Sequence, residues 1–157
     1  MNLFKIRSMK KITYSLYIVL LDQVSKFVVL STLGFERSKN IIPNFLNLTL
    51  VKNKGAAFSL LSNSTTFLTI TSVIASLLLI IIIFKYPPKS YWNFIGLAYL
   101  LGGTVGNGID RLFKGYVIDF LELVPINFPI FNIADISINI AIICFIVDLT
   151  KDKSRIK

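Results

Sequence analysis

Residues Gly102 to Asp135 read GGTVGNGIDRLFKGYVIDFLELVPINFPIFNIAD, and this stretch joins two strongly apolar parts of the chain. It places Asp110, Asp119 and Asp135 at the ends of the apolar segments. A charged side chain at the centre of a membrane helix costs about 2.5–3.5 kcal/mol on insertion scales, so charges near such segments are retained for a reason. We interpret Asp119 and Asp135 as a catalytic carboxylate pair.

The composition of the whole chain is that of a membrane protein. The 157 residues are 54% hydrophobic and 16% charged, with a mean hydropathy of +0.71, which is too apolar for an ordinary soluble domain. We expect one integral membrane domain over residues 1–157. The net charge of +9 comes from basic residues beside the apolar runs, which favours lipid headgroups over nucleic acid as the anionic neighbour.

The chain contains no histidine and a single cysteine, Cys144. The commonest general base and the commonest zinc ligand are therefore missing, and no disulfide can form within one chain. We expect Cys144 to be a buried packing residue. Hydrolytic chemistry would have to use carboxylates, lysine or serine, and we expect neither a metal nor a cofactor.

Four segments are expected to be membrane-spanning helices: 12–30, 64–84, 92–111 and 131–149. Residues 64–84 carry no charge and are long enough to cross about 30 Å of hydrocarbon. The basic N-terminus resembles a secretory signal, but no small-residue cleavage site follows, so we expect a retained helix. Asp22 and Lys26 are four residues apart and should form a structural ion pair on one helix face.

The distribution of lysine and arginine predicts the orientation of the chain. Ten of them lie at the two termini and between the second and third spans, and six lie in the two remaining loops. By the positive-inside rule we expect both termini in the cytoplasm and both long loops outside.

Shorter patterns predict the remaining structure. The alternation NFLNLTL over 44–50 predicts a small sheet at the membrane surface, followed by a turn at Asn53. Gly102 and Gly106 have the spacing of close helix packing, and no Lys-Ser or Lys-Thr follows that would make this glycine-rich stretch a phosphate loop.

The predicted spans bring Asp119 and Asp135 to the outer interface. Val117, Asp119 and Leu121 share one side of a short predicted strand, and Asp135 lies about 6 Å into the fourth helix. Two close carboxylates share one proton, so that one can activate water while the other protonates a carbonyl or a leaving amine. This is the chemistry of aspartic peptide hydrolysis.

Other interpretations stay open at the level of the residues alone. A single aspartate at an interface often only caps a helix or extends its side chain to the aqueous phase, as we expect of Asp148 and Asp152. A small transporter would place ionisable groups near mid-span, where only Asp22 and Lys26 come close. A non-enzymatic assembly protein would explain the glycine packing but not two matched aspartates.

Five motifs, in this order, resemble those of bacterial lipoprotein signal peptidase, also called signal peptidase II. They are DQVSK at 22–26, NKGAAFS at 53–59, GNGIDR at 106–111, VIDF at 117–120 and FNIAD at 131–135. The resemblance covers nearly the whole chain, with an extension that begins at Met1 or Met9. It implies a four-helix aspartic peptidase of the bacterial cytoplasmic membrane, with an extracytoplasmic β-cradle and a short amphipathic surface helix. Its implied reaction is cleavage of a prolipoprotein just before the diacylglyceryl-modified cysteine.

The resemblance also implies roles for single residues. The catalytic pair falls on Asp119 and Asp135, and substrate backbone carbonyls would be held by Asn53 and Arg111. Small residues from Gly55 to Ala57 would border the cleft. The implied supporting shell comprises Asp22, Lys26, Asn53, Gly55, Asn107, Asp110, Arg111 and Asn132. The expected partners are lipid-modified prolipoproteins and membrane lipids, and we expect a monomer that binds no nucleic acid.

Overall fold

The computed structural model describes residues 3–55, 64–87, 90–126 and 128–153, and within them it contains four long helices and one small sheet. The helices are α1 (Leu3–Leu33), α2 (Thr65–Lys85), α3 (Tyr91–Lys114) and α4 (Ile133–Lys153). The strands are β1 (Ser38–Ile42), β2 (Leu46–Asn53) and β3 (Val117–Leu123). The short surface helix that the resemblance implies is not among the elements of the described residues.

Among the described residues, three helices are long and apolar enough to cross a membrane: Phe4–Leu33, Thr65–Lys85 and Ile133–Lys151. They correspond to three of the four predicted spans. The helix α3 does not reach the same hydropathy, because glycine, asparagine and aspartate occupy much of its buried face. The first helix starts well before residue 12, and the last starts at Ile133 rather than at residue 131.

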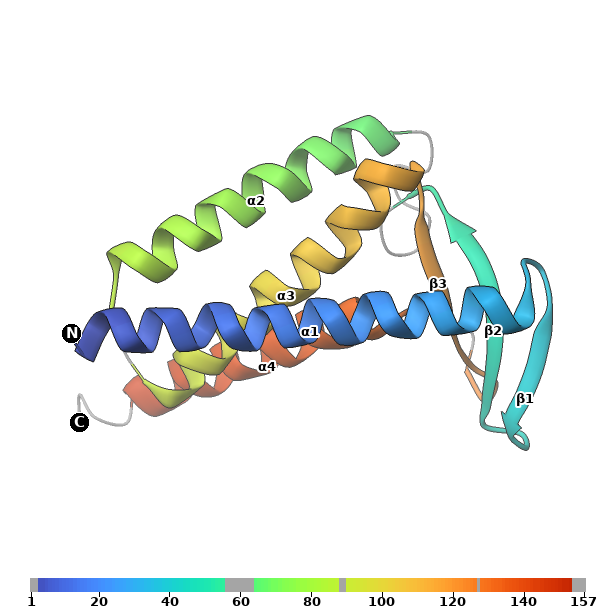
Figure 1. The fold of residues 1–157 in the computed structure, drawn as a ribbon. Coiled ribbons are helices and arrows are strands. Elements are labelled where there is room, and N and C mark those ends of the chain that lie inside the picture. The colour runs from blue at the N-terminus through green and yellow to red at the C-terminus, as the bar shows by residue number, and fades with distance from the viewer. Residues whose placement is uncertain (1–2, 56–63, 88–89, 127, 154–157) are drawn as a thin grey trace.

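The helix α3 lies at the centre of the bundle and packs against α1, α2 and α4 (Figure 1). Its glycines permit this approach. A Cβ at Gly102 would lie 2.7 Å from the Cβ of Ile18 on α1, and a Cβ at Gly103 would lie 2.5 Å from the carbonyl oxygen of Ala134 on α4. The predicted packing role of Gly102 and Gly106 is confirmed, and Gly103 adds a contact that the four-residue spacing did not indicate.

The sheet has the order β1-β2-β3 with both pairs antiparallel. The alternating segment 44–50 correctly predicted β2, whereas β1 was not predicted. The sheet packs on the last turns of α1 through a core of Val29, Leu50, Ile118 and Phe120. This core fixes β3, and therefore Asp119, against the helical bundle.

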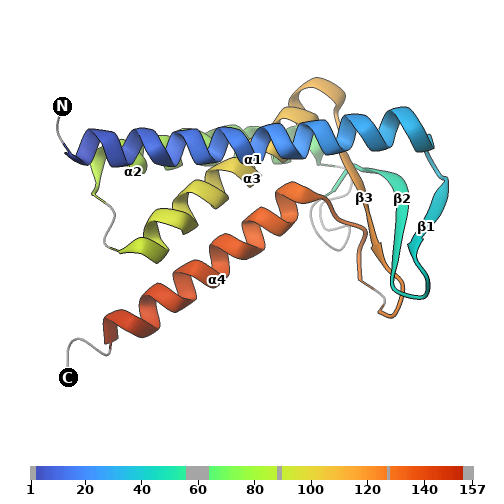
Figure 2. The ribbon, with the colours of Figure 1, turned by 60° about the horizontal axis from the view of Figure 1, so that its bottom comes forward.

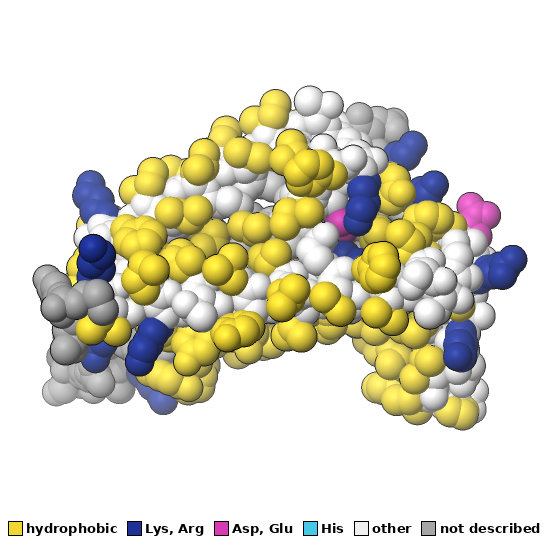
Figure 3. Space-filling view, in the orientation of Figure 1, with side chains coloured by type: hydrophobic (Ala, Val, Ile, Leu, Met, Phe, Trp, Pro, Cys, Tyr) yellow, Lys and Arg dark blue, Asp and Glu magenta, His cyan; other side chains and the backbone are white. Residues whose placement is uncertain are grey.

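The bundle and the sheet lie at opposite ends of an elongated molecule (Figures 1 and 2). The start of α1 and the end of α4 are at the end away from the sheet. Hydrophobic side chains cover the flanks of the helices, while lysine and arginine gather at the two ends (Figure 3). Exposed apolar residues on these flanks, such as Phe27 at 70% exposure, are suited to lipid contact. The single cysteine, Cys144, is buried and free, as predicted.

Candidate active site

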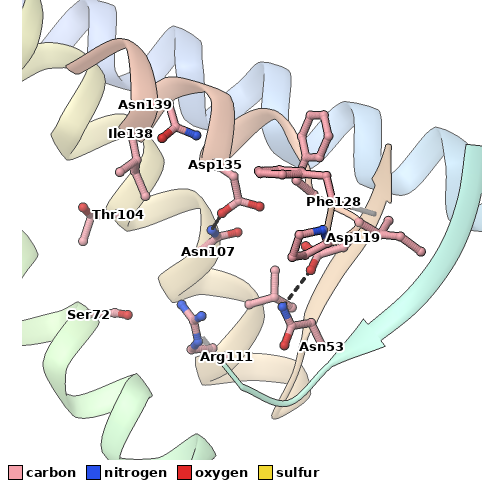
Figure 4. Close-up of a pocket in the computed structure, with 14 residues that line it drawn as sticks. Asn53, Ser72, Thr104, Asn107, Arg111, Asp119, Phe128, Asp135, Ile138 and Asn139 are labelled. Atoms are coloured by element: carbon pink, nitrogen blue, oxygen red, sulfur yellow. Dashed lines mark hydrogen bonds between the residues drawn. The ribbon is translucent and has the colours of Figure 1, made fainter. Parts of the chain in front are cut away.

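Asp119 and Asp135 line the same cavity, which has a volume of about 380 Å³ (Figure 4). Asp119 projects from the middle of β3, and Asp135 is the third residue of α4. The cavity walls come from β2, β3, the three helices α2, α3 and α4, and the segment that precedes α4. They consist of Asn53, Ser72, Thr104, Asn107, Arg111, Val117, Asp119, Phe128, Pro129, Ile130, Phe131, Asp135, Ile138 and Asn139.

Asn132 links the two aspartates. Its side-chain Nδ2 donates to Oδ1 of Asp119 at 2.6 Å, and its backbone N–H donates to Oδ2 of Asp135 at 3.1 Å. In return, its Oδ1 accepts from the backbone N–H of Asp135 at 3.0 Å, which completes a reciprocal cap of α4. The fourth span was predicted to start at residue 131, but α4 starts at Ile133, so Asn132 caps the first turn and the cap sets the position of Asp135.

The remaining oxygen of each carboxylate accepts a hydrogen bond from the side-chain amide of another asparagine. Nδ2 of Asn53 donates to Oδ2 of Asp119 at 2.8 Å, the bond drawn as a dashed line in Figure 4. Nδ2 of Asn107 donates to Oδ1 of Asp135 at 2.8 Å. Because neutral amides orient a carboxylate without cancelling its charge, the pair stays electrostatically coupled.

Burial raises the pKa of Asp119 from its ordinary value to about 6, and the charge of Asp135 acts in the same direction. The hydrogen bonds from Asn53 and Asn132 and the charge of Lys26 oppose this shift. The side chain of Asp119 is nearly inaccessible, at 2% exposure, which explains why burial dominates. The pKa of Asp119 is therefore suited to a group that gains and loses a proton near neutral pH.

A buried ionic network supports the pair from α1. Nζ of Lys26 lies 2.8 Å from Oδ2 of Asp22, 2.9 Å from Oδ2 of Asp110 and 3.0 Å from Oδ1 of Asn107. The predicted Asp22–Lys26 ion pair is confirmed, but it is one part of a larger set. Asp110 also pairs with Lys114 at 2.7 Å, so two acids face two lysines.

The same network holds the backbone around both aspartates. Oδ1 of Asp22 accepts from the N–H of Ala134 at 2.9 Å, next to Asp135. Oδ2 of Asp110 accepts from the N–H of Ile118 at 3.2 Å, next to Asp119. Asp22 and Asp110 are fully buried, which fits supporting positions and removes Asp110 from contact with the cavity.

Arg111 lines the cavity and holds the segment that follows β2. Its Nη2 donates to the carbonyl oxygen of Gly55 at 3.3 Å, and the N–H of Gly55 donates to Oδ1 of Asn53 at 2.8 Å. Gly55 is buried, while Ala56 and Ala57 lie outside the described residues. The structure thus brings all ten predicted site residues into one connected region. In the part of the chain described here, no group of acidic or cysteine side chains is arranged to hold a metal ion.

Several cavity residues were missed by the sequence analysis. Asn139 follows Asp135 by four residues and Thr104 precedes Asn107 by three, so helical spacing could have indicated both. Ser72 on α2 and Phe128 carried no such signal. Their positions depend on how the helices and the segment before α4 pack.

Comparison with known proteins agrees with the motifs. The profile of the family described as signal peptidase (SPase) II matches residues 14–151. The lipoprotein signal peptidase of Parasynechococcus marenigrum is 47% identical over 137 residues, which cover 87% of this chain and 86% of that protein. The lipoprotein signal peptidase of Enterococcus faecalis is 40% identical over 143 residues, covering 91% and 89%.

A solved structure shares the fold. A bacterial membrane enzyme determined by the in meso method at 2.3 Å resolution superposes with a TM-score of 0.87 at 36% identity. The match covers 94% of this chain and 92% of that structure. A profile match over most of the chain, relatives at 40–47% identity and a common fold lead to one conclusion: the chain belongs to the signal peptidase (SPase) II family of lipoprotein signal peptidases.

Proposed function

We propose that Asp119 and Asp135 are the catalytic pair with which this membrane peptidase removes the signal peptide from prolipoproteins. The family assignment supports signal-peptide removal as the reaction. The geometry of the cavity supports Asp119 and Asp135 as the residues that carry it. The observation that carries the assignment is the geometry around Asn132, which binds one carboxylate through its side chain and the other through its backbone.

The chemistry requires one proton on the pair. The ionised carboxylate takes a proton from a water molecule as the water oxygen bonds to the scissile carbonyl carbon, and the protonated carboxyl donates a hydrogen bond to the carbonyl oxygen. The C–N bond then breaks, and the leaving amine receives a proton from the pair. The products are a free carboxylic acid and a free amine. The pKa of about 6 at Asp119 supports a pair that keeps its proton into the working pH range.

Asn53 and Arg111 are proposed to hold the substrate backbone. Arg111 donates one N–H to the carbonyl oxygen of Gly55 and also lines the cavity. The remaining N–H groups of its guanidinium group are suited to bind a substrate carbonyl oxygen. Asn53 is fixed between Gly55 and Asp119, so a substrate that contacts it would be aligned with the pair. Asp22, Lys26, Asn107, Asp110 and Asn132 act as positioning residues.

The placement in the membrane is part of the proposal. Both termini would lie in the cytoplasm, the sheet would lie outside, and the carboxylate pair would lie near the outer face, where water reaches it. A prolipoprotein could then keep its diacylglyceryl chains in the lipid while the bond before the modified cysteine enters the cavity. The excess of basic residues at the terminal end of the bundle supports this orientation.

We further propose that α3 is a fourth membrane-spanning helix. Its 24 residues span about 36 Å, and its polar face is buried by neighbouring helices rather than exposed to lipid. The whole chain would form one domain that works as a monomer on lipidated protein substrates and binds no nucleic acid. The family assignment favours this peptidase over the transporter and assembly-protein alternatives.

The test replaces each aspartate separately. Asp119→Asn and Asp135→Asn preserve size but prevent the pair from sharing a proton, so each variant is expected to lose cleavage of a diacylglyceryl prolipoprotein by more than a thousandfold. Purified, folded variants in detergent should be compared with the wild-type chain. Turnover near the wild-type rate in either folded variant would refute the assignment.

A further inference from the structure

Two polar side chains line the cavity one helical turn farther from the sheet than the carboxylate pair: Thr104 on α3 and Asn139 on α4. Thr104 precedes Asn107 by three residues and Asn139 follows Asp135 by four, so they continue the same helix faces. Figure 4 shows both beside the cavity, on the side of Asn107 and Asp135 away from Asn53. Neither residue takes part in holding the aspartates.

Neither side chain has a hydrogen-bond partner among the residues that the structure describes. Hydroxyl groups in helices commonly donate to a carbonyl one turn earlier, as Ser72 does to Leu68 and Ser137 does to Ile133, both at 2.8 Å. Thr104 makes no such bond, and Asn139 has no hydrogen-bond partner, within residues 3–55, 64–87, 90–126 and 128–153. Asn139 also lies within Ile133–Lys151, a segment apolar enough to cross a membrane. The side chain of Asn139 is exposed and lines the cavity, so a peptide that enters the cavity can reach its amide.

The proposed reaction requires polar groups at this depth. A signal peptide that crosses the lipid as a helix must unwind near the scissile bond before the carboxylates can reach it. Unwinding releases backbone N–H and C=O groups, each of which costs several kcal/mol when it is unsatisfied in hydrocarbon. Non-helical backbone is tolerated at membrane depth only where protein or a water-filled cavity surrounds it.

We propose that Thr104 and Asn139 hydrogen-bond the main chain of the unwound signal peptide just before the scissile bond, an inference that rests on the proposed function. Asp135 and Asn139 are about 6 Å apart along α4, and extended chain covers about 3.3 Å per residue. The side-chain carbonyl of Asn139 therefore accepts from a peptide N–H about two residues before the cleaved bond. The Thr104 hydroxyl bonds the same stretch from the α3 side.

The test uses near-isosteric apolar variants. Thr104→Val and Asn139→Leu remove hydrogen bonding while they keep the side-chain volume, and each is expected to lower kcat/KM by about tenfold, the effect of one lost hydrogen bond that leaves a partner unpaired. Thr71→Val on α2 is the matched control. Thr71 is exposed and bonds only carbonyl groups of its own helix, so its loss should leave kcat/KM unchanged.

A substrate change separates binding from a purely structural effect. Replacing the second peptide bond before the scissile bond by an ester removes the N–H that Asn139 is proposed to bind. Wild-type enzyme should cleave the ester substrate about tenfold more slowly, whereas Asn139→Leu should show little further loss. Full activity of both variants would overturn the inference. It would also be overturned if the ester slowed cleavage by Asn139→Leu by the same factor as cleavage by the wild-type enzyme. The proposed function is judged separately, because it fails only if Asp119→Asn or Asp135→Asn remains active.

Discussion

Neutral amides, rather than cations, contact the carboxylate of Asp119. Asn53 and Asn132 each donate one hydrogen bond to it, while Lys26 acts through its charge without contacting it. A directly paired cation would have favoured the ionised form strongly. Amides allow the pKa of Asp119 to stay near 6 and still fix the direction of both oxygens. The site thereby combines a precise geometry with a group that can carry a proton.

This arrangement predicts the pH dependence of an Asn53 variant. In the proposed mechanism the pair works with one proton, so kcat/KM should fall as the pH rises through the Asp119 pKa of about 6. The Asn53 hydrogen bond lowers that pKa, and Asn53→Ala should raise it further. The alkaline limb of the profile of kcat/KM against pH should therefore move to higher pH by about one unit.

The control for this measurement is Asn40→Ala. Asn40 bonds only Asn47 on the exposed part of the sheet and does not line the cavity, so its loss should leave the limb in place. A limb in the Asn53 variant that stays fixed, or that moves to lower pH, would contradict the account of the Asp119 pKa.

The sequence predicted single residues well where local periodicity determines them. The period of two around Val117 placed Asp119 on a strand, and the start of an apolar segment placed Asp135 near a helix end. The cap formed by Asn132 was not predicted, because the fourth helix was expected to start at residue 131, two residues before its observed start at Ile133. The contact between Asn53 and Asp119 joins residues 66 positions apart and depends on strand register, which local pattern does not determine.

At the scale of elements, the position of α4 depends on the absence of side chains on α3. Gly103 lies against the carbonyl of Ala134, and Gly106 lies against the carboxylate of Asp22. The first turn of α4 therefore rests directly on the backbone of α3. Any displacement of that turn also moves Asp135.

This contact makes Gly103→Ala a sharp test of helix placement. The added Cβ would lie 2.5 Å from a backbone oxygen, so α4 must shift, and overpacking of this kind costs about 1–3 kcal/mol. We expect a lower thermal unfolding midpoint in detergent and a decrease of at least tenfold in the cleavage rate.

Gly108→Ala on the same helix provides the comparison. Its Cβ would lie 3.4 Å from the Cβ of Ser72, an ordinary contact, and alanine favours helix over glycine by about 1 kcal/mol. This variant should retain both activity and stability. Equal behaviour of the two variants would show that close packing at Gly103 does not position α4.

Prediction of the elements succeeded where apolar length or alternation was strong. The segment 64–84 and α2 agree within one residue at each end, whereas β1 was missed because Ser38–Ile42 has little apolar character and all five residues are exposed. Its pairing with β2 holds it in the sheet. The extension of α1 to Leu3 was also missed, because the basic N-terminal residues carry no apolar pattern.

At the scale of the whole molecule, the lysine and arginine side chains on the face shown in Figure 3 gather toward the two ends of an apolar bundle. In the sequence, the terminal segments and the loop between the second and third predicted spans hold ten lysine and arginine residues, against six in the two other loops. Composition alone was enough to predict a membrane protein, and the orientation stays a prediction from the distribution of lysine and arginine. It could not predict the cavity, which requires α2, α3, α4 and the sheet to meet.

The orientation can be measured by labelling introduced cysteines in a Cys144→Ser background. Lys39→Cys on the sheet and Lys5→Cys near the N-terminus replace exposed residues at opposite ends. A membrane-impermeant thiol reagent added to intact spheroplasts should modify Lys39→Cys and should reach Lys5→Cys only after lysis. The reverse labelling pattern would place the proposed catalytic pair on the cytoplasmic side.

The cap at the start of α4 has a further consequence for how the site forms. The amide protons of Ala134 and Asp135 are held by Asp22 and Asn132, residues that also support or bind the proposed catalytic pair. Fraying of this one turn would expose both amides to solvent exchange and separate the carboxylates in the same event. The carboxylate pair is therefore assembled or lost together with this turn, and the exchange rates of the two backbone protons report how often the turn opens.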